Sequence, residues 1–128
     1  MRVFVDAYAW IEYLEGSASG SKVRQIIQEN EILSLSLTIA EVVSRVKRKG
    51  YDTDVAYESI IANSRVINIS PEISKVGGLF HAEIRKKIKN FGLVDALLLA
   101  AARDMKTHIL TGDHHFKGFK EAIFLADI

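Results

Sequence analysis

The stretch GLVDALLLAAARDMKTHILTGDHHF, residues Gly92–Phe116, decides the expected fold. Its segment Ala96–Ala102 contains only alanine and leucine, so the helix that it forms should be buried on most sides. The run Thr107–Leu110 then predicts a short strand. One carboxylate, Asp95, stands at the start of the helix, and another, Asp113, follows the strand. Burial of such a charge is costly unless it is paired, acts as a helix cap or binds a metal.

Length and composition are those of an ordinary globular chain. The 128 residues are the usual size of one domain, and we expect a single domain over residues 1–128. No uninterrupted apolar run approaches the ~20 residues that span a bilayer, which predicts no membrane association. The chain contains no cysteine, which excludes disulfides and zinc–thiolate sites and agrees with a cytoplasmic location. An acid as early as Asp6 also argues against a signal peptide.

Short apolar runs alternate with helical patterns along the whole chain. The expected strands are Val3–Val5, Ile32–Leu37, Val66–Ile69, Thr107–Leu110 and Ile123–Leu125. The expected helices are Ala7–Glu15, Lys22–Gln28, Thr38–Lys49, Asp54–Arg65, Pro71–Lys89 and the segment rich in alanine and leucine. This alternation predicts a three-layer α/β/α fold, in which a short, mostly parallel central sheet is covered on both faces.

Local sequence signals set the expected helix boundaries. The run GSASGS, Gly16–Ser21, predicts a flexible connection, and Thr38-Ile39-Ala40-Glu41 fits a capping box at the start of a helix. Ser70 followed by Pro71 predicts another helix start. In the helix that follows, five apolar residues at helical spacing are expected to face inward: Ile73, Val76, Phe80, Ile84 and Ile88.

Carboxylates recur where the expected strands end. Asp6 follows the first strand, Glu41 lies in the first turn of the helix after the second, and Asp113 follows the fourth. Ligands of parallel α/β proteins bind outside the carboxyl ends of the strands, and a helix packed on the sheet can bring Asp95 to the same place. Each acid alone has a structural explanation as a helix cap or a turn residue.

Taken together, the four acids favour a metal site. Clustered carboxylates repel one another and raise their own pKa values unless a cation neutralises them. A site of oxygen donors without cysteine suits Mg²⁺ or Mn²⁺, and such ions activate water and hold phosphodiester oxygens during hydrolysis. We therefore predict a metal-dependent phosphodiesterase, in which Asp95 and Asp113 lie within metal-bridging reach of Asp6.

The four acids stand in the contexts VFVDAYAWIEYL, LTIAEVV, GLVDALLLAAA and ILTGDHHF, which resemble the motifs of PIN-domain ribonucleases. Over essentially the whole chain, the sequence is most similar to VapC-type toxins of toxin–antitoxin pairs. The resemblance implies a PIN fold, endonucleolytic cleavage of RNA, an Mg²⁺ or Mn²⁺ cofactor, and four metal-binding, catalytic acids: Asp6, Glu41, Asp95 and Asp113. It gives Thr111 an auxiliary role near the last acid. It also implies two protein partners, a cognate antitoxin that covers the acidic pocket and a second copy of the chain in a homodimer.

RNA contacts would have to come from local basic clusters, because the net charge of +1 creates no overall basic field. Arg45 and Arg48, on the Glu41 side of their helix, are the candidate residues for binding the RNA backbone. The triplet Asp113-His114-His115 also spells the motif of the DHH phosphoesterases, but the other motifs of those proteins are missing here. In a PIN domain we expect both histidines to be surface residues of the turn.

Two other interpretations of the acids have less support in the sequence than a PIN-domain ribonuclease. Haloacid-dehalogenase phosphatases need a DxD motif after the first strand, whereas Asp6 is followed by Ala7 and Tyr8. A catalytically silent PIN fold, serving as an RNA- or protein-binding module, remains the alternative function. Retention of all four acids argues against it, because a scaffold gains nothing from costly clustered charge.

Overall fold

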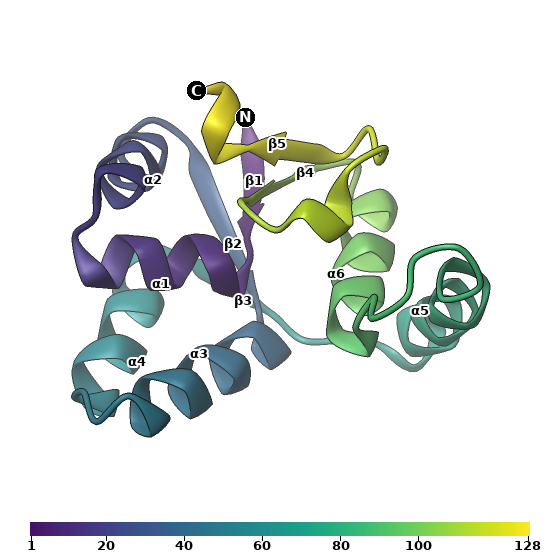
Figure 1. Ribbon diagram of the computed structural model, residues 1–128, viewed down its shortest axis with the longest axis horizontal. Helices are drawn as coiled ribbons and strands as arrows, with labels where there is room; N and C mark the ends of the chain where they lie inside the picture. The colour runs from purple at the N-terminus through teal and green to yellow at the C-terminus, as the bar shows by residue number, and fades with distance from the viewer.

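The computed structural model describes residues 1–128 and contains one five-stranded sheet (Figure 1). The strands are β1 (Arg2–Val5), β2 (Glu31–Leu35), β3 (Arg65–Ile67), β4 (His108–Thr111) and β5 (Ala122–Phe124). They lie in the order β3-β2-β1-β4-β5, and every pair of neighbours is parallel. Because all strands point the same way, their carboxyl ends form a single edge of the sheet, which we call the carboxyl edge.

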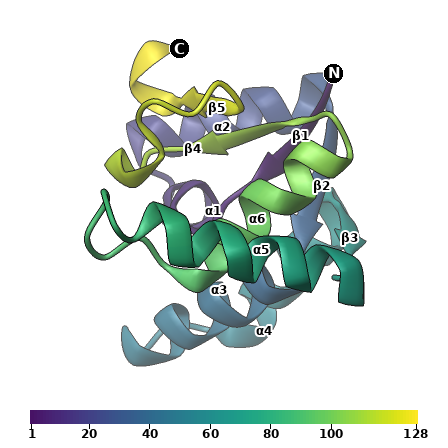
Figure 2. The same ribbon diagram turned by 90° about the vertical axis from the view of Figure 1, so that its right-hand side faces the viewer.

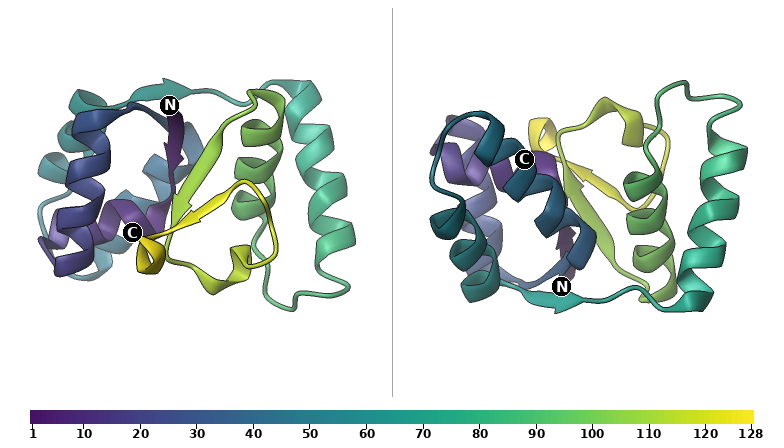
Figure 3. Two further views of the ribbon diagram at one scale, coloured as in Figure 1. Left: turned by 90° about the horizontal axis from the view of Figure 1, so that it is seen from above. Right: turned by 90° about the horizontal axis from the view of Figure 1, so that it is seen from below.

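Helices cover both faces of the sheet, which confirms the predicted three-layer fold (Figures 1 and 3). One face carries α1 (Ala7–Glu15), α2 (Ala18–Glu29), α3 (Ser36–Arg48) and α4 (Thr53–Asn63). The other face carries α6 (Leu93–Asp104), and α5 (Pro71–Ile84) packs on the outer side of α6 (Figure 2). Two short 3₁₀ turns, η1 (His114–Phe116) and η2 (Leu125–Asp127), follow β4 and β5. No helix of this chain combines the length and the apolar character needed to cross a membrane.

The core is divided between the two faces by the alternation of side chains along the strands. In β1, Val3 and Val5 pack with α1 to α4, whereas Phe4 packs with α6 on the opposite face. The segment Ala96–Ala102 of α6 is buried at every position, as its composition predicts. Because β1 is central and covered on both faces, the residue that follows it, Asp6, also lies in the interior.

The segment Gly16–Ser21 is not the flexible connection that its composition indicated. Helix α2 begins at Ala18, and Ser17 is its N-cap, whose hydroxyl accepts a hydrogen bond from the Gly20 N–H at 3.0 Å. Gly20 lies so close to α1 that any side chain there would clash with the backbone of Glu12. The small residues therefore permit close packing of α1 against α2.

The predicted capping box at Thr38–Glu41 is also wrong. Strand β2 ends at Leu35, so α3 begins at Ser36, two residues before its expected start, and no side chain caps it. Thr38 is buried within the helix, and its hydroxyl has no hydrogen-bond partner. Glu41 therefore lacks the structural role that its sequence context indicated.

The predicted start of α5 is confirmed, because the Ser70 hydroxyl accepts a hydrogen bond from the Ile73 N–H at 3.1 Å and Pro71 is the first helical residue. The helix ends at Ile84, earlier than the expected end at Lys89, and the chain continues in turns. Apart from α2 and α5, the observed elements begin and end within two residues of the predicted ones.

The inner face of α5 differs from the prediction at one position. Val76 is exposed, whereas Gly77 is the buried residue that faces α6. A pattern of apolar side chains cannot reveal a glycine, so the sequence placed the contact one residue too early. The other residues predicted to face inward do pack around α6: Ile73, Phe80, Ile84 and Ile88.

Gly77→Ala should destabilise the protein, because the added methyl group would meet Leu97, with the Leu97 Cα only 3.1 Å away. Forcing the two packed helices apart costs about 1–3 kcal/mol in the free energy of unfolding. Gly78→Ala is the matched control on the same helix, since a methyl group there meets nothing within 4 Å and alanine favours the helix. Urea denaturation measures both, and equal stability of the two variants would contradict the close packing of α5 on α6.

Candidate functional site

Asp6 and Asp113 lie at the carboxyl edge, just beyond the strands that carry them. Asp6 follows β1 and caps α1, where its Oδ1 accepts a hydrogen bond from the Ala9 N–H at 2.8 Å. Asp113 follows β4 and caps η1, where its Oδ1 accepts a hydrogen bond from the His115 N–H at 2.9 Å. Strands β1 and β4 are neighbours in the sheet, so the two carboxylates start from adjacent strand ends.

Asp95 and Glu41 approach the carboxyl edge from the two helical layers. Asp95 lies in the first turn of α6 and accepts a hydrogen bond from the backbone of Gly92. Glu41 lies in α3, on the opposite face of the sheet, and its side chain remains exposed. The acids therefore come from four segments that are far apart in the sequence.

Burial dominates the ionisation of Asp6. It raises the pKa of this carboxyl from its ordinary value of 3.8 to about 7, and the negative charges of Asp95 and Asp113 add to the rise. Hydrogen bonds from the Thr111 hydroxyl and the Ala9 N–H lower the pKa but do not cancel the effect of burial. Asp6 thus has a strong tendency to hold a proton or to acquire another positive partner.

Glu41 responds to the same neighbours. Its pKa rises to about 7 through partial burial, followed by the charge of Asp95, while Arg45 lowers it and Asp113 makes a smaller contribution to the rise. Although burial is the main cause of this rise, Glu41 keeps much of its surface in water, and solvent screens its neighbours' charges more effectively than at Asp6.

Asp95 interacts electrostatically with each of the other three acids. Burial raises its pKa, and the charge of Asp113 raises it further, whereas the Gly92 N–H and His115 lower it. Since Asp95 also acts on Asp6 and Glu41, each acid is close enough to another to change its ionisation. The four predicted acids therefore belong to one electrostatic site.

No lysine or arginine neutralises this site by a direct ion pair. None of the four acids has a Lys or Arg nitrogen within 4.0 Å of a carboxylate oxygen. A set of oxygen donors with so little competing positive charge fits a hard divalent cation. However, no three of these acids bring ligand atoms within 4.8 Å of one another. Three of these acids would therefore share a single ion only after their side chains move, and the reach of Asp95 and Asp113 to Asp6 stays a prediction.

Thr111, the last residue of β4, connects two of the acids. Its buried hydroxyl accepts a hydrogen bond from the Asp113 N–H at 2.9 Å. The same hydroxyl is the hydrogen-bond partner that lowers the pKa of Asp6. Thr111 thus lies beside the last acid, where the sequence placed it, and it also contacts the first.

The histidines of the turn have different environments. His114 is a surface residue, as expected, with 78% of its side chain exposed, but His115 is only 24% exposed and faces Asp113. The expectation of two surface histidines is therefore wrong for His115. The sequence contains no signal for this difference, because the backbone of η1 decides which of two adjacent side chains points inward.

Tyr8, two residues after Asp6, is a further side chain at the site. Its ring lies against Gly112, so closely that any side chain at Gly112 would collide with the ring. Tyr8 is nevertheless partly exposed, at 41%. An aromatic surface therefore borders the turn that carries Asp113.

The candidate RNA-binding arginines lie along α3 beyond Glu41. Arg45 is close enough to lower the pKa of Glu41. Arg48 is exposed, and its Nε donates a hydrogen bond to the Ser44 carbonyl at 3.4 Å. Positive charge thus borders the Glu41 side of the acidic site.

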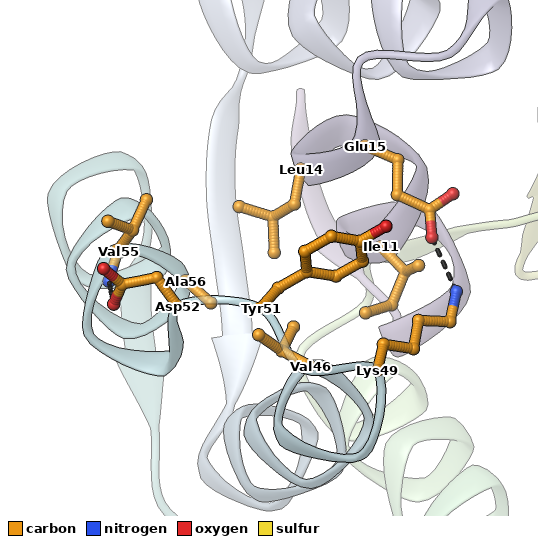
Figure 4. Close-up of a pocket in the computed structure, with 9 residues that line it drawn as sticks. All are labelled: Ile11, Leu14, Glu15, Val46, Lys49, Tyr51, Asp52, Val55 and Ala56. Atoms are coloured by element: carbon orange, nitrogen blue, oxygen red, sulfur yellow. Dashed lines mark hydrogen bonds and ion pairs between the residues drawn. The ribbon is translucent and has the colours of Figure 1, made fainter.

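A separate groove lies between the carboxyl-terminal parts of α1 and α3 and the start of α4 (Figure 4). Its volume is about 580 Å³, and its apolar walls are formed by Ile11, Leu14, Val46, Tyr51, Val55 and Ala56. An ion pair between Glu15 and Lys49, at 2.6 Å, lies at its rim. None of the four acids lines this groove, so it is not part of the acidic site.

Comparison of the sequence with models of known protein families identifies a family that matches this parallel α/β/α fold. The sequence model of the PIN domain family matches residues 3–122, nearly the whole chain. The chain belongs to the PIN domain family. A comparison with curated protein sequences gave no significant match.

Several solved structures have the same fold. A toxin–antitoxin complex from Klebsiella pneumoniae matches with a TM-score of 0.73 at 19% identity, over 96% of this chain and 97% of that chain. VapBC2 from Rickettsia felis, bound to a DNA fragment from its promoter, matches with a TM-score of 0.72 at 19% identity, over 97% of each chain. VapC20 from Mycobacterium tuberculosis, a toxin that cleaves the sarcin–ricin loop, matches with a TM-score of 0.75 at 17% identity, over 93% of this chain and 97% of that chain.

Asp6 should make the stability of the protein depend on pH. Its pKa is higher in the folded chain than in the unfolded chain, so the free energy of unfolding falls as the pH rises from about 4 to about 7. Asp6→Asn retains an N-cap side chain but removes the charge. The variant should therefore gain stability relative to wild type at high pH, by on the order of 1–3 kcal/mol.

Urea denaturation with EDTA, at about pH 5 and about pH 8, measures this difference. Asp54→Asn, which removes one exposed carboxylate, is the matched control. A difference between Asp6→Asn and wild type that stays constant over this range would contradict the ionisation of a buried Asp6.

Proposed function

We propose that this protein is a metal-dependent endoribonuclease that acts as the toxin of a toxin–antitoxin pair, with residues 1–128 forming a single PIN domain. The observation that carries the proposal is a group of four interacting carboxylates without a lysine or arginine ion pair. Such a group destabilises a fold unless a cation neutralises it. Membership of the PIN domain family makes phosphodiester hydrolysis the matching chemistry. The toxin role is supported by the similarity of the fold to toxins over nearly the whole chain.

The residues that would hold the cation, Mg²⁺ or Mn²⁺, are Asp6, Glu41, Asp95 and Asp113. When bound, such an ion lowers the pKa of a water molecule and neutralises charge on the phosphodiester. The protein backbone holds two of these carboxylates in place. The Ala9 N–H donates a hydrogen bond to one oxygen of Asp6, and the His115 N–H donates one to an oxygen of Asp113. Thr111 contacts both acids and would act as the auxiliary residue that keeps Asp6 and Asp113 in fixed positions relative to each other.

Arg45 and Arg48 would bind the RNA backbone beside the acids. The acidic site repels phosphate groups, so affinity has to come from positive charge at its border. Arg45 adjoins Glu41, and Arg48 follows one turn later on α3. Contacts of this kind position a strand without reading its sequence, so the choice of RNA would depend on other features.

We further propose a cognate antitoxin and a second copy of the chain as protein partners, and a cytoplasmic location where RNA and antitoxin are made. The similar structures from Klebsiella pneumoniae and Rickettsia felis are toxin–antitoxin assemblies. This chain also exposes large apolar side chains on and beside α4 and α5: Tyr51, Val55, Tyr57, Ile61, Val76 and Leu79. Exposed apolar patches favour contacts with other proteins.

Asp95→Asn should abolish RNA cleavage, because it removes the carboxylate that interacts with all three other acids. We expect the rate to fall by at least about 100-fold with folding retained, since Asn can accept the same backbone hydrogen bond. The measurement is cleavage of a panel of cellular RNAs with Mg²⁺ or Mn²⁺, analysed by sequencing of the RNA ends. Asp54→Asn is the matched control on an exposed acid, and full activity of Asp95→Asn would overturn the catalytic assignment.

Mn²⁺ should raise the thermal stability of the wild-type protein, because it relieves repulsion among the four acids. Saturation at 100 times the dissociation constant stabilises a folded protein by about 2.7 kcal/mol, which is several degrees in Tm for a chain of this size. Asp95→Asn should lose most of this response. Differential scanning fluorimetry with and without Mn²⁺ tests it, and a catalytically silent binding module would show no response in either protein.

A further inference from the structure

The turn after β4 contains the only group of three His or acidic residues in the chain whose ligand atoms converge. Asp113, His114 and His115 each place one such atom within 4.8 Å of the other two. Asp113 Oδ1 lies 2.9 Å from His115 Nδ1 and 3.8 Å from His114 Nδ1. No lysine or arginine forms an ion pair with Asp113. The donor set is therefore one carboxylate oxygen and two imidazole nitrogens.

These separations agree with the geometry of a bound transition metal. Bonds of about 2.0–2.2 Å to nitrogen and oxygen place adjacent ligand atoms about 3.0–3.5 Å apart in octahedral or tetrahedral coordination. The His115 separation is close to this range. The His114 separation is somewhat larger, but that side chain is 78% exposed and has room to rotate.

The backbone of η1 holds the group together. Asp113 is the N-cap of the turn, and its Oδ1 is fixed by the hydrogen bond from the His115 N–H at 2.9 Å. The two imidazole rings lie with their centroids 4.3 Å apart. Phe116, the next residue, is fully buried and anchors the turn in the core. Three consecutive residues thus present their donors to one point without a rearrangement of the main chain.

We propose that Asp113, His114 and His115 form a second metal site that binds Zn²⁺, or Co²⁺ in its place, at the rim of the acidic site. Imidazole nitrogen favours zinc and cobalt, whereas Mg²⁺ takes oxygen ligands, so this site has a different metal preference from the four carboxylates. It shares Asp113 with the proposed magnesium or manganese site but does not depend on nuclease activity. The competing explanation is an ordinary hydrogen bond from His115 Nδ1 to Asp113, which needs no metal.

Cobalt absorption spectroscopy tests the site directly. Full-length protein without a polyhistidine tag is freed of metals with EDTA, dialysed and titrated with Co²⁺, and the visible d–d bands are recorded. Zn²⁺ affinity is then measured by calorimetry. We expect wild type to bind one such ion with high affinity, His114→Ala and His115→Ala to weaken this binding by about tenfold or more, and the double variant to keep only the weaker binding of the four carboxylates.

His81→Ala on α5 is the matched control, and it should bind like wild type. His114→Ala is the decisive variant, because its exposed side chain contributes little to folding, which thermal melting verifies. Wild type that binds Co²⁺ no more tightly than the double variant would overturn the site. Cleavage of RNA with Mg²⁺ is measured on the same proteins, so that failure of the nuclease and failure of the zinc site are separate results.

Discussion

The buried charge of Asp6 is the constraint on which the acidic site depends. A rise of its pKa from 3.8 to about 7 corresponds to roughly 4 kcal/mol in favour of the neutral form. The N-terminus of a helix offsets such a cost by only on the order of 1 kcal/mol. Capping of α1 therefore does not explain why a carboxylate follows the central strand, where it is 4% exposed. The position makes physical sense for an acid that acquires a positive partner.

Helix caps and metal ligands need not be alternatives. Asp6 and Asp113 each use one oxygen, Oδ1, to accept a backbone N–H, and the Thr111 hydroxyl is a further hydrogen-bond partner of Asp6. Asp95 likewise reaches back to Gly92. A cap fixes the carboxylate against rotation, which is what a preorganised ligand requires. Glu41 is the exception, since it has no such bond, lies on the exposed side of α3 and is the most free to move.

The sequence predicted the sheet, both helical layers and the acids because these depend on alternation and strand ends. The predictions from the sequence were wrong where small residues determine how helices pack. Small residues such as Gly20 suggest flexibility, and a pattern of apolar side chains gives no sign of Gly77, although both glycines permit close helix contacts. The predicted start of α3 is two residues late because Ser36 and Leu37 continue the alternation of leucine and serine in β2, although the backbone is already helical there. The sequence also contains no pattern that predicts the directions of the side chains in η1, where His115 points inward and His114 points to solvent.

Elsewhere the chain does neutralise a buried carboxylate. Glu121 is 5% exposed, and the Arg103 Nε lies 3.2 Å from its Oε1. This ion pair joins the residue before β5 to the last turn of α6, away from the carboxyl edge. Removing the partner of a buried charge is strongly destabilising, so a structural acid is expected to keep its arginine. The four acids at the carboxyl edge lack such a partner, and this contrast within one chain supports the proposal that a cation from outside the protein neutralises them.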